Sequence, residues 1–284
     1  MSYQINTDSC CDFNAAQYKE NNVSCASLTV TYNGESYNNF SDPAAVKAFY
    51  DELRGGVMAT TSAANPEDWA NLMKRALDQG EDVLALCFSS GLSTTYQSAV
   101  IAAKDLRESY PDRKIYVVDS LCAALGQGLL VWHACRKRDE GMDINQAAAW
   151  VEENKLNICH WVTVDDLSHL KRGGRISATT AIVGTMLNIK PIIYVDNDGH
   201  LINTAKVRGR KPAMDYLLKK FDETATDKET VFIGHGDCPE DAAALEAMLK
   251  DRGVKNVVTG YVGPVIGAHT GPGVLVIFFM GSHR

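Results

Sequence analysis

The sequence predicts an α/β protein of two domains, in which a mainly parallel sheet with helices on both faces is followed by a second α/β domain with a mixed sheet. The first observation is length, because 284 residues correspond to about two domains of ordinary size. The second is the alternation of short apolar runs with amphipathic segments in the first half, which is typical of a parallel sheet with helical cover. The third is a hairpin pattern around residue 197 in the second half, which indicates antiparallel strands. We expect domains at residues 1–157 and 158–284.

Helix starts are the clearest local signals in the first half. Asp42-Pro43 and Asn65-Pro66 each place a capping side chain before a proline at the first helical position. Asp143 and Gln146 have the spacing of a capping box. The apolar run 83–88 does not alternate, which indicates a strand buried on both faces. We therefore expect strands at 2–6, 25–32, 83–88 and 114–118, and helices at 43–53, 66–79, 95–110, 123–140 and 144–154.

The second half mixes a hairpin with helix–strand units. The turn Asp196-Asn197-Asp198-Gly199 separates two apolar runs. Ser177 follows a polar loop at 171–177 and is expected to cap a helix that ends before Lys190-Pro191. The expected strands are 160–164, 191–195, 200–206, 230–234, 256–259 and 274–279, and the other expected helices are 210–221 and 240–252.

Composition excludes several classes of function. The chain is 45% hydrophobic and 22% charged, as in ordinary globular proteins. A formal net charge of −7 does not provide the basic surface that nucleic-acid binding normally requires. Eight cysteines without a C-x-x-C pair favour reduced thiols over a disulfide framework or a zinc site. We expect no nucleic-acid partner, no metal and no cofactor.

The amino-terminal segment carries no targeting signal. Residues 1–6 have neither the basic start nor the apolar centre of a signal peptide. No apolar run approaches the roughly 18 residues that a membrane span requires. We therefore expect a cytoplasmic protein without stable membrane insertion.

Two polar segments are candidate ligand sites. Residues 89–93 join a buried strand to a helix, so their hydroxyls and free backbone N–H groups meet at the positive end of a helix dipole, where anions bind. Thr60-Thr61-Ser62 offers three further hydroxyls before another helix. The alternative for both segments is a helix cap without a ligand.

Residues 260–273 are rich in glycine and proline and contain one titratable side chain, His269. Glycine lets the backbone approach other groups closely. One interpretation is a tight connection between two buried strands, in which His269 makes a structural hydrogen bond. The other is a loop that carries His269 to a ligand.

Other polar groups favour structural roles. Asp8 and Asp119 follow strands and are expected to tie loop amides together, although both are also candidate catalytic carboxylates. His235 and Asp237 have no further His or Cys at ligand spacing, which argues against a metal site. The basic run 206–211 is either a solvated face or a docking surface for an acidic partner.

Motifs along the whole chain resemble the DegV family. The matching segments, in order, are Thr7-Asp8-Ser9, Thr61-Ser62, S-S-G-L-S-x-T-Y-Q-S-A at 89–99, Asp119-Ser120, G-G-R-I-S at 173–177, Lys190-Pro191, Lys206-Val207-Arg208 and G-P-V-I-G-x-H-x-G-P-G at 263–273. The resemblance implies a two-domain α/β protein that binds one long-chain fatty acid between its domains, like the FakB carriers. In that system a separate fatty-acid kinase phosphorylates the bound carboxylate, and the acyl phosphate enters phospholipid synthesis.

The residues make physical sense of that expectation. A long acyl chain gains about 0.8 kcal/mol per buried CH₂, so a few donors suffice to orient the carboxylate. The expected carboxylate contacts are Thr61, Ser62, Ser90, Ser93 and His269. The resemblance suggests Arg175 and Arg208 as contacts for the phosphate or for the kinase.

The sequence departs from the family pattern at two points. Ala63-Ala64-Asn65 replaces part of a Thr-Ser-x-Pro-Ser segment, and Thr94 stands where the family usually has glycine. Both changes fall beside the expected head-group site. The alternative function is a serine-dependent esterase or acyltransferase with Ser90 or Ser93 as nucleophile and His269 as base, although no G-x-S-x-G motif surrounds either serine.

Overall fold

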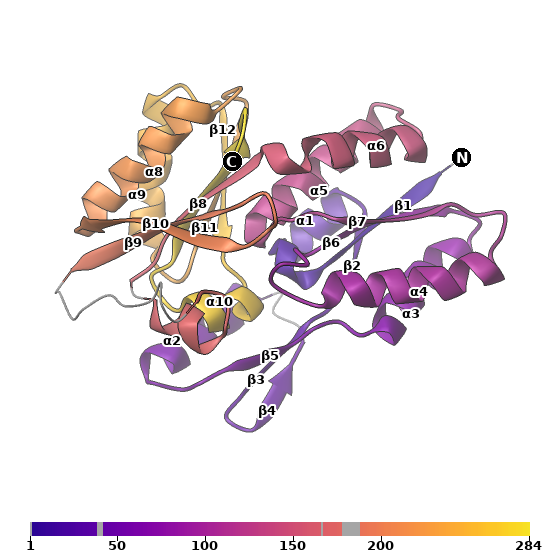
Figure 1. The fold of residues 1–284 in the computed structure, drawn as a ribbon, viewed down its shortest axis with the longest axis horizontal. Helices are drawn as coiled ribbons and strands as arrows, with labels where there is room; N and C mark the ends of the chain where they lie inside the picture. Colours follow the sequence, from indigo (N-terminus) through magenta and orange to yellow (C-terminus); the bar gives the residue numbers. More distant parts are fainter. Residues whose placement is uncertain (1, 39–41, 166, 178–187) are drawn as a thin grey trace.

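The first part of the chain forms a parallel sheet with strand order β2-β1-β6-β7 (Figure 1). The computed structural model describes residues 2–38, 42–165, 167–177 and 188–284. The strands are β1 (Tyr3–Asp8), β2 (Val23–Ala26), β6 (Asp82–Cys87) and β7 (Ile115–Asp119). Every residue of β6 is buried, which confirms the strand predicted from its unbroken apolar run.

Helices cover both faces of this sheet. Val83, Ala85 and Cys87 of β6 pack toward α3 (Pro66–Leu77) and α4 (Thr95–Ser109). Leu84 and Leu86 point the opposite way, toward α5 (Ala124–Asp139) and α6 (Ile144–Asn154). This alternation follows from the two-residue period of a strand. The predicted parallel sheet with two helical layers is confirmed.

The predicted helix caps set the helix starts. The Asp42 side chain accepts a hydrogen bond from Ala44 N at the start of α2 (Pro43–Arg54). Asn65 and Asp68 form a capping box at α3, and Asp143 and Gln146 form one at α6. These caps satisfy N–H groups that have no partner inside the helix. The shorter elements nearby are η1 (Ser9–Cys11), α1 (Ala15–Glu20) and η2 (Lys155–Asn157).

The second part of the chain forms a mixed sheet with strand order β10-β9-β8-β13-β11-β12. The hairpin of β9 (Ile189–Val195) and β10 (Leu201–Arg208) is confirmed, although a bulge interrupts its register near Thr204. β11 (Thr230–His235) and β12 (Asn256–Tyr261) are parallel, whereas β13 (Leu275–Met280) runs antiparallel to β8 (Ile158–Thr163) and to β11. Helices α8 (Arg210–Thr224) and α9 (Pro239–Asp251) cover one face of this sheet.

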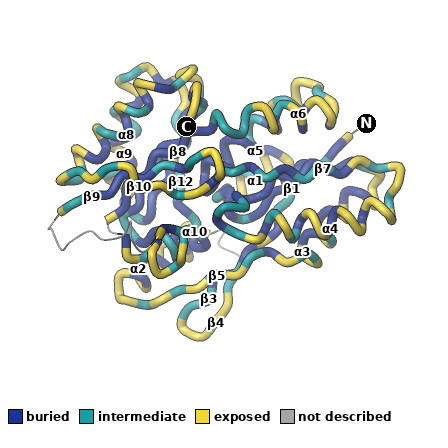
Figure 2. Tube along the Cα trace, viewed as in Figure 1, coloured by how far each residue is buried: buried dark blue, intermediate teal, exposed yellow. Residues whose placement is uncertain are grey.

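Helix α5 lies between the two sheets (Figures 1 and 2). One hydrophobic cluster joins its Leu125 and Leu129 to Leu86 of β6 and to Phe278 of β13. Two glycines allow this close packing, because a Cβ at Gly126 would overlap His160 and lie 2.7 Å from Phe278, and one at Gly128 would lie 2.6 Å from Cys11 O. The two sheets therefore share a core through α5.

The predicted strand 25–32 is wrong, because the chain changes sheets within it. Val23–Ala26 pairs with β1, whereas β3 (Thr29–Tyr32) pairs with β4 (Glu35–Tyr37) and β5 (Thr60–Ser62) in a separate antiparallel sheet. The change occurs at Leu28, whose N–H donates to Ser9 Oγ instead of to a strand. Because residues 60–62 form strand β5 of this separate sheet, their hydroxyls lie on a strand and not at a helix cap.

The predicted loop 260–273 contains a helix, α10 (Pro264–Thr270). Pro264 occupies the first position of α10, where a backbone N–H would have no partner within the helix. Gly271 follows the helix with a positive φ of 76°, which ends it. Helix α10 packs against α2 and α7 (Ser168–Arg172). The preceding strand β12 lies at the edge of its sheet and is partly exposed, contrary to the buried strand expected there.

Two further expectations concern the middle of the chain. The helix expected after Ser177 falls on residues 178–187, outside the described residues. All strands of the parallel sheet precede residue 157 and all strands of the mixed sheet follow it, while the division into domains 1–157 and 158–284 stays a prediction. Within the described part of the chain, no helix is long and apolar enough to cross a membrane.

Candidate functional site

A cavity of about 400 Å³ lies where the two sheets approach each other. Phe88 and Leu92, which follow β6, form part of its wall, and Val162, Ile193 and Phe278 of the mixed sheet form another part. Its size falls within the usual range of small-molecule pockets, roughly 300–1,000 Å³. Most of its surface is apolar, so it suits a ligand with a hydrocarbon portion.

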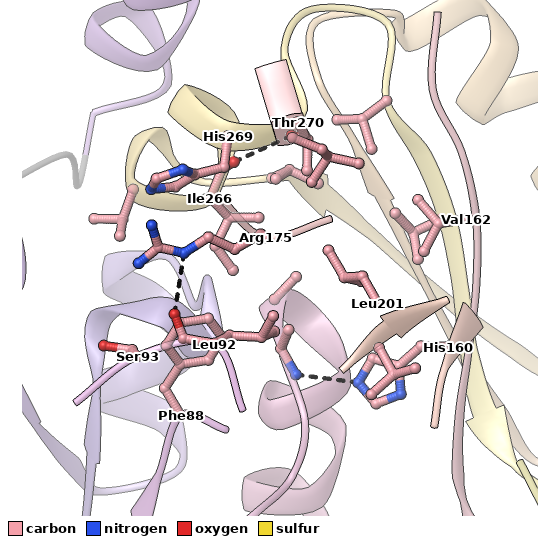
Figure 3. A pocket seen from close by; sticks show the side chains of 18 of the residues that line it. Phe88, Leu92, Ser93, His160, Val162, Arg175, Leu201, Ile266, His269 and Thr270 are labelled. Atoms are coloured by element: carbon pink, nitrogen blue, oxygen red, sulfur yellow. Dashed lines mark hydrogen bonds between the residues drawn. The ribbon is translucent and has the colours of Figure 1, made fainter. Parts of the chain in front are cut away.

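Several polar side chains line this cavity. Thr61, Ser90, Ser93, Arg175 and His269 all line it. Figure 3 shows Ser93, Arg175 and His269 on one side, with His160 and Val162 on the other. The structure thus brings together five predicted side chains that are separated by up to 208 positions in the sequence.

His269 meets Thr61 at the wall of this cavity. Its Nε2 lies 2.8 Å from Thr61 Oγ1, and its Nδ1 is buried without a partner among the described residues. Burial, followed by the positive charge of Arg175, lowers the pKa of His269 to about 4. His269 is therefore neutral at pH 7 and can exchange a hydrogen bond with a hydroxyl or an anion.

Arg175 connects this part of the cavity to the loop after β6. Its Nε donates to Leu92 O at 3.1 Å, and its Nη1 donates to Gly173 O. Gly173 in turn makes room for His269, because a side chain at Gly173 would overlap Nδ1 of the ring. The segment 173–175 therefore positions one cation and one imidazole at the same place.

The loop at residues 89–93 is held by hydrogen bonds on both sides. Ser89 Oγ donates to Gly199 O at 2.9 Å, and Ser90 N donates to Asp119 Oδ1 at 3.1 Å. Ser93 Oγ accepts from Thr95 N at 3.2 Å, so Ser93 supports the first turn of α4 while lining the cavity. The N-cap residue of α4 is Thr94, which makes no side-chain cap bond, so Ser93 does not cap the helix in the way the cap interpretation expected.

The two candidate carboxylates act on the backbone and do not line the cavity. Asp119 Oδ1 also accepts from Leu121 N, and Asp8 accepts from Cys10 N at 3.0 Å and from Phe88 N at 2.7 Å. Burial raises the pKa of Asp8 to about 6. These contacts tie loop amides together, as the structural interpretation proposed.

Two predicted site residues lie elsewhere. Ser62 is an exposed residue of β5 that pairs with Thr29, and it does not line the cavity. Arg208 is exposed at the end of β10, also outside the cavity. Adjacent residues of a strand point to opposite faces, so Ser62 points away from the cavity that its neighbour Thr61 lines.

Sequence reasoning missed His160 as a lining residue. Its Nδ1 donates to Ile158 O at 2.9 Å, and its Nε2 accepts from Ala123 N at 3.1 Å, just before α5. Burial lowers its pKa to about 3, with Arg284 adding to the effect. The sequence shows only that His160 lies in an apolar strand. That position does not distinguish a residue that lines a cavity from a residue of the core.

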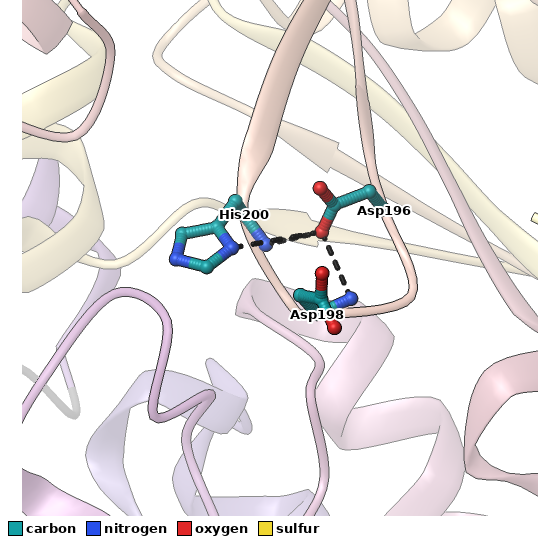
Figure 4. Close-up of side chains that lie close together, drawn as sticks. All are labelled: Asp196, Asp198 and His200. Carbon is teal, nitrogen blue, oxygen red and sulfur yellow. Dashed lines mark hydrogen bonds and ion pairs between the residues drawn. The ribbon is translucent and has the colours of Figure 1, made fainter.

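One group of potential metal ligands occurs among the described residues, at the tip of the β9–β10 hairpin (Figure 4). Asp196 Oδ1 already accepts from Asp198 N at 3.0 Å and from His200 N at 2.8 Å. Such bonds are characteristic of an Asx turn. They account for the arrangement of these side chains, and we infer no metal site from it.

The fold and the cavity define a class of protein: two α/β units that share a core and enclose a mainly apolar cavity with polar side chains in its lining. The sequence profile of the DegV family, described as an uncharacterised protein family, matches residues 2–282. A DegV domain-containing protein of Clostridium perfringens is 42% identical over 286 aligned positions, covering 99% of this chain and 98% of that relative. The chain belongs to the DegV family.

Solved structures agree with this assignment. A DegV family protein from Thermus thermophilus, described by its fatty-acid binding, is 30% identical with a TM-score of 0.89, covering 99% of this chain and all of that one. DegV from Bacillus subtilis, described as a fatty acid binding protein, is 27% identical with a TM-score of 0.84 and the same coverage.

Proposed function

We propose that this protein binds a single long-chain fatty acid, with the acyl chain in the cavity between the sheets and the carboxylate at Thr61 and His269. The observation that carries the proposal is the cavity itself, which is mainly apolar and has the Ser93 hydroxyl, the Arg175 guanidinium and the His269 imidazole on one side. The fatty-acid binding described for the Thermus thermophilus and Bacillus subtilis relatives supports it.

The proposed division of roles follows from the chemistry of the ligand. The acyl chain gains affinity by leaving water, at about 25 cal/mol per Å² of apolar surface. The carboxylate accepts hydrogen bonds from His269 and from the hydroxyls of Thr61, Ser90 and Ser93, and charge-assisted bonds of this kind are stronger than neutral ones. Arg175 supplies the nearby positive charge that stabilises a buried carboxylate.

We further propose that the protein presents its ligand to a separate fatty-acid kinase, as the resemblance to FakB carriers implies. In that reaction a carboxylate oxygen forms a bond to the terminal phosphorus of a nucleoside triphosphate, the bond from that phosphorus to the bridging oxygen breaks, and the nucleoside diphosphate leaves. Arg208 belongs to this part of the proposal, because its exposed position on an edge strand suits contact with a partner and not with the ligand. A cytoplasmic location is part of the same proposal.

Lipid extraction tests the binding function. The protein is purified without added lipid, denatured in organic solvent, and the extract is analysed by mass spectrometry. We expect fatty acid at close to one molecule per chain. If no lipid is found, and the purified protein also fails to bind added palmitate, the proposed function is wrong.

The serine hydrolase alternative has less support. His269 Nε2 is paired with Thr61, and Ser93 Oγ lies 2.9 Å from Thr95 Oγ1. A hydrolytic serine needs a base within hydrogen-bond reach, oriented by a third group, whereas His269 Nδ1 has no partner in the described residues. Labelling of the wild type by an active-site serine probe, lost in Ser90→Ala, would favour the enzyme.

A further inference from the structure

Residues 121–124 contribute to the cavity wall on the side away from His269. Ala123 and Ala124 line the cavity, and Ala123 N donates to His160 Nε2 at 3.1 Å. Figure 3 shows His160 across the cavity from His269. With the carboxylate at His269, as proposed above, the methyl end of an acyl chain lies toward this wall.

The backbone of this segment is strained. Leu121 has φ of 52° and Ala124 has φ of 54°, a region that residues other than glycine, asparagine and aspartate rarely adopt. Such conformations persist only where the surrounding structure holds them in place. The shape of this part of the cavity wall therefore depends on the groups that bind residues 121–124.

Arg284 binds this segment and the mixed sheet at the same time. Its Nη1 donates to Leu121 O and to Asp196 O, both at 2.8 Å, and its Nη2 donates to Cys122 Sγ at 3.1 Å. Its Nε donates to Ile158 O at 3.1 Å. One guanidinium thus joins the chain after β7 to the start of β8 and to the turn of the β9–β10 hairpin.

These contacts require the shape of a guanidinium. Arg284 forms no ion pair with a carboxylate in the part of the chain that the structure describes. Besides the Cys122 thiol, its partners are main-chain oxygens, which include Lys155 O at 2.7 Å. A planar group with donors in several directions can bind separate carbonyls at once, whereas a lysine ammonium presents its donors at one point.

The same hairpin forms another part of the cavity wall. Val195 and Leu201, on either side of its turn, line the cavity. The turn also contacts the loop after β6, because Ser89 Oγ donates to Gly199 O at 2.9 Å and a Cβ at Gly199 would overlap that hydroxyl. Arg284 therefore lies behind two parts of the cavity wall and holds them together.

We propose that Arg284 is a positioning residue that closes the cavity beside the methyl end of the acyl chain and so limits the chain length that the protein accepts. The proposal rests on the fatty-acid function proposed above and adds a determinant of specificity to it. Arg284 does not line the cavity and acts by holding residues 121–124 against the mixed sheet. Loss of its hydrogen bonds lets the strained segment relax, which leaves room for a longer chain.

The experiment compares saturated fatty acids that differ by pairs of CH₂ groups: laurate, myristate, palmitate, stearate and arachidate. Affinities are measured by competition with a fluorescent fatty acid for lipid-free wild type, Arg284→Met, Arg284→Lys and His283→Ala. Methionine keeps much of the side-chain length of arginine without its donors. His283→Ala is the matched control, because His283 is the exposed neighbour of Arg284, its Nδ1 lies 2.9 Å from Ser282 Oγ, and it does not line the cavity.

In the wild type we expect each added pair of CH₂ groups to raise the affinity about 10-fold until the cavity is filled, after which the gain stops. Arg284→Met binds the shorter acids within about threefold of the wild type, and binds the first acid beyond the wild-type limit about 10-fold more tightly than the wild type does. Arg284→Lys has an intermediate profile, because lysine keeps the charge without the planar fork. His283→Ala has the wild-type profile.

Thermal melting of each variant shows whether it is folded before the titration, and Arg284→Lys carries the comparison if Arg284→Met does not fold. Three results would overturn the proposal while leaving fatty-acid binding intact. The Arg284 variants keep the wild-type length limit, weaken binding of all the acids by the same factor, or shift the limit no further than His283→Ala does. A wild type that binds none of the acids instead refutes the proposed function itself.

Discussion

His269 is the residue on which the proposed carboxylate site depends most directly. Its pKa is lowered to about 4 by burial and by Arg175, and a bound carboxylate would favour the protonated imidazole because opposite charges attract. We expect the pKa of His269 to lie near 4 in lipid-free protein and to rise when fatty acid binds. Imidazole NMR chemical shifts followed against pH measure both values.

His133 is the internal control for that titration. Burial lowers its pKa to about 4 as well, but it lies on α5 and does not line the cavity. Its pKa should be the same with and without lipid. Equal pKa values of His269 in the two states would remove it from carboxylate binding.

Thr61 provides a second test at this scale. Thr61→Val keeps the β-branched shape that suits strand β5 but removes the hydroxyl that contacts His269. We expect palmitate affinity to fall about 10-fold, the cost of roughly one hydrogen bond to a charged group. Thr31→Val is the matched control on neighbouring strand β3, where the hydroxyl bonds to Ser36 and not to the cavity. Equal affinities of the two variants would contradict the role of Thr61.

Side-chain chemistry made part of the candidate site, the polar lining of the cavity, predictable. Thr61, Ser90, Ser93 and His269 stood out in the sequence because hydroxyls and a histidine occurred in loop-like segments with few other polar groups. Ser62 was included because two adjacent hydroxyls look equivalent until the strand that separates their directions is known. The apolar wall of the cavity and the buried His160 beside it were not predictable, because the residues that line a cavity have the same composition as residues of the core.

At the scale of elements, local signals set the boundaries and long-range contacts set the pairing. The caps at Asp42, Asn65 and Asp143 fixed helix starts correctly, since a cap involves only neighbouring residues. The change of sheet at Leu28 and the helix α10 were missed. Both depend on groups far away in the sequence, Ser9 in one case and α2 with α7 in the other.

Helix α5 offers a stability test at this scale. In Gly126→Ala the new Cβ would overlap His160 and crowd Phe278. Overpacking typically costs about 1–3 kcal/mol, partly offset by the roughly 1 kcal/mol that alanine gains over glycine in a helix. We therefore expect a net loss in the free energy of unfolding, measured by urea denaturation.

Gly55→Ala is a suitable control for that measurement. Gly55 ends α2 with φ of −69°, and a Cβ there meets only backbone oxygens, at 3.2 and 3.6 Å. We expect its free energy of unfolding to change by less than about 1 kcal/mol. If Gly126→Ala were as stable as Gly55→Ala, the two sheets would not be as tightly joined through α5 as the contacts indicate.

At the scale of the whole molecule, buried histidines predict sensitivity to acid. The pKa of His160 is lowered to about 3 and those of His133 and His269 to about 4, in each case mainly by burial. Unfolded histidines take up protons near pH 6.5, whereas the folded ones stay neutral. Their contribution to stability is complete above pH 6.5 and is lost as the pH falls toward 4.

Two buried carboxylates oppose this trend. Burial raises the pKa of Asp8 to about 6 and that of Asp12 well above its ordinary value, so the folded state binds protons that the unfolded state lacks and gains stability as the pH falls. The pKa of a fourth histidine, His235, is also lowered by burial. The four lowered histidine pKa values together outweigh the two raised carboxylate pKa values, and we expect a lower urea midpoint at pH 5 than at pH 7 for lipid-free protein. A higher midpoint at pH 5 would mean that the carboxylates dominate.

Lipid removal is the corresponding ligand test. A ligand that binds only the folded state stabilises it by about 2.7 kcal/mol at a free concentration of 100 times Kd. We expect lipid-free protein to melt at a lower temperature than the protein as purified, and added palmitate to restore the difference. Calorimetry with hexadecane, which lacks the carboxylate, would separate filling of the cavity from recognition of the head group.

The shared core around α5 gives that stabilisation a cellular consequence. The cavity proposed to hold the acyl chain lies between the same two sheets that α5 joins, so a bound acyl chain would fill the interior of the molecule and not a surface groove. Proteases and chaperones act on the unfolded fraction, which changes several-fold for each 1–2 kcal/mol or so of stability. With the proposed ligand, the amount of this protein in a cell would follow the supply of fatty acid without any change in gene expression.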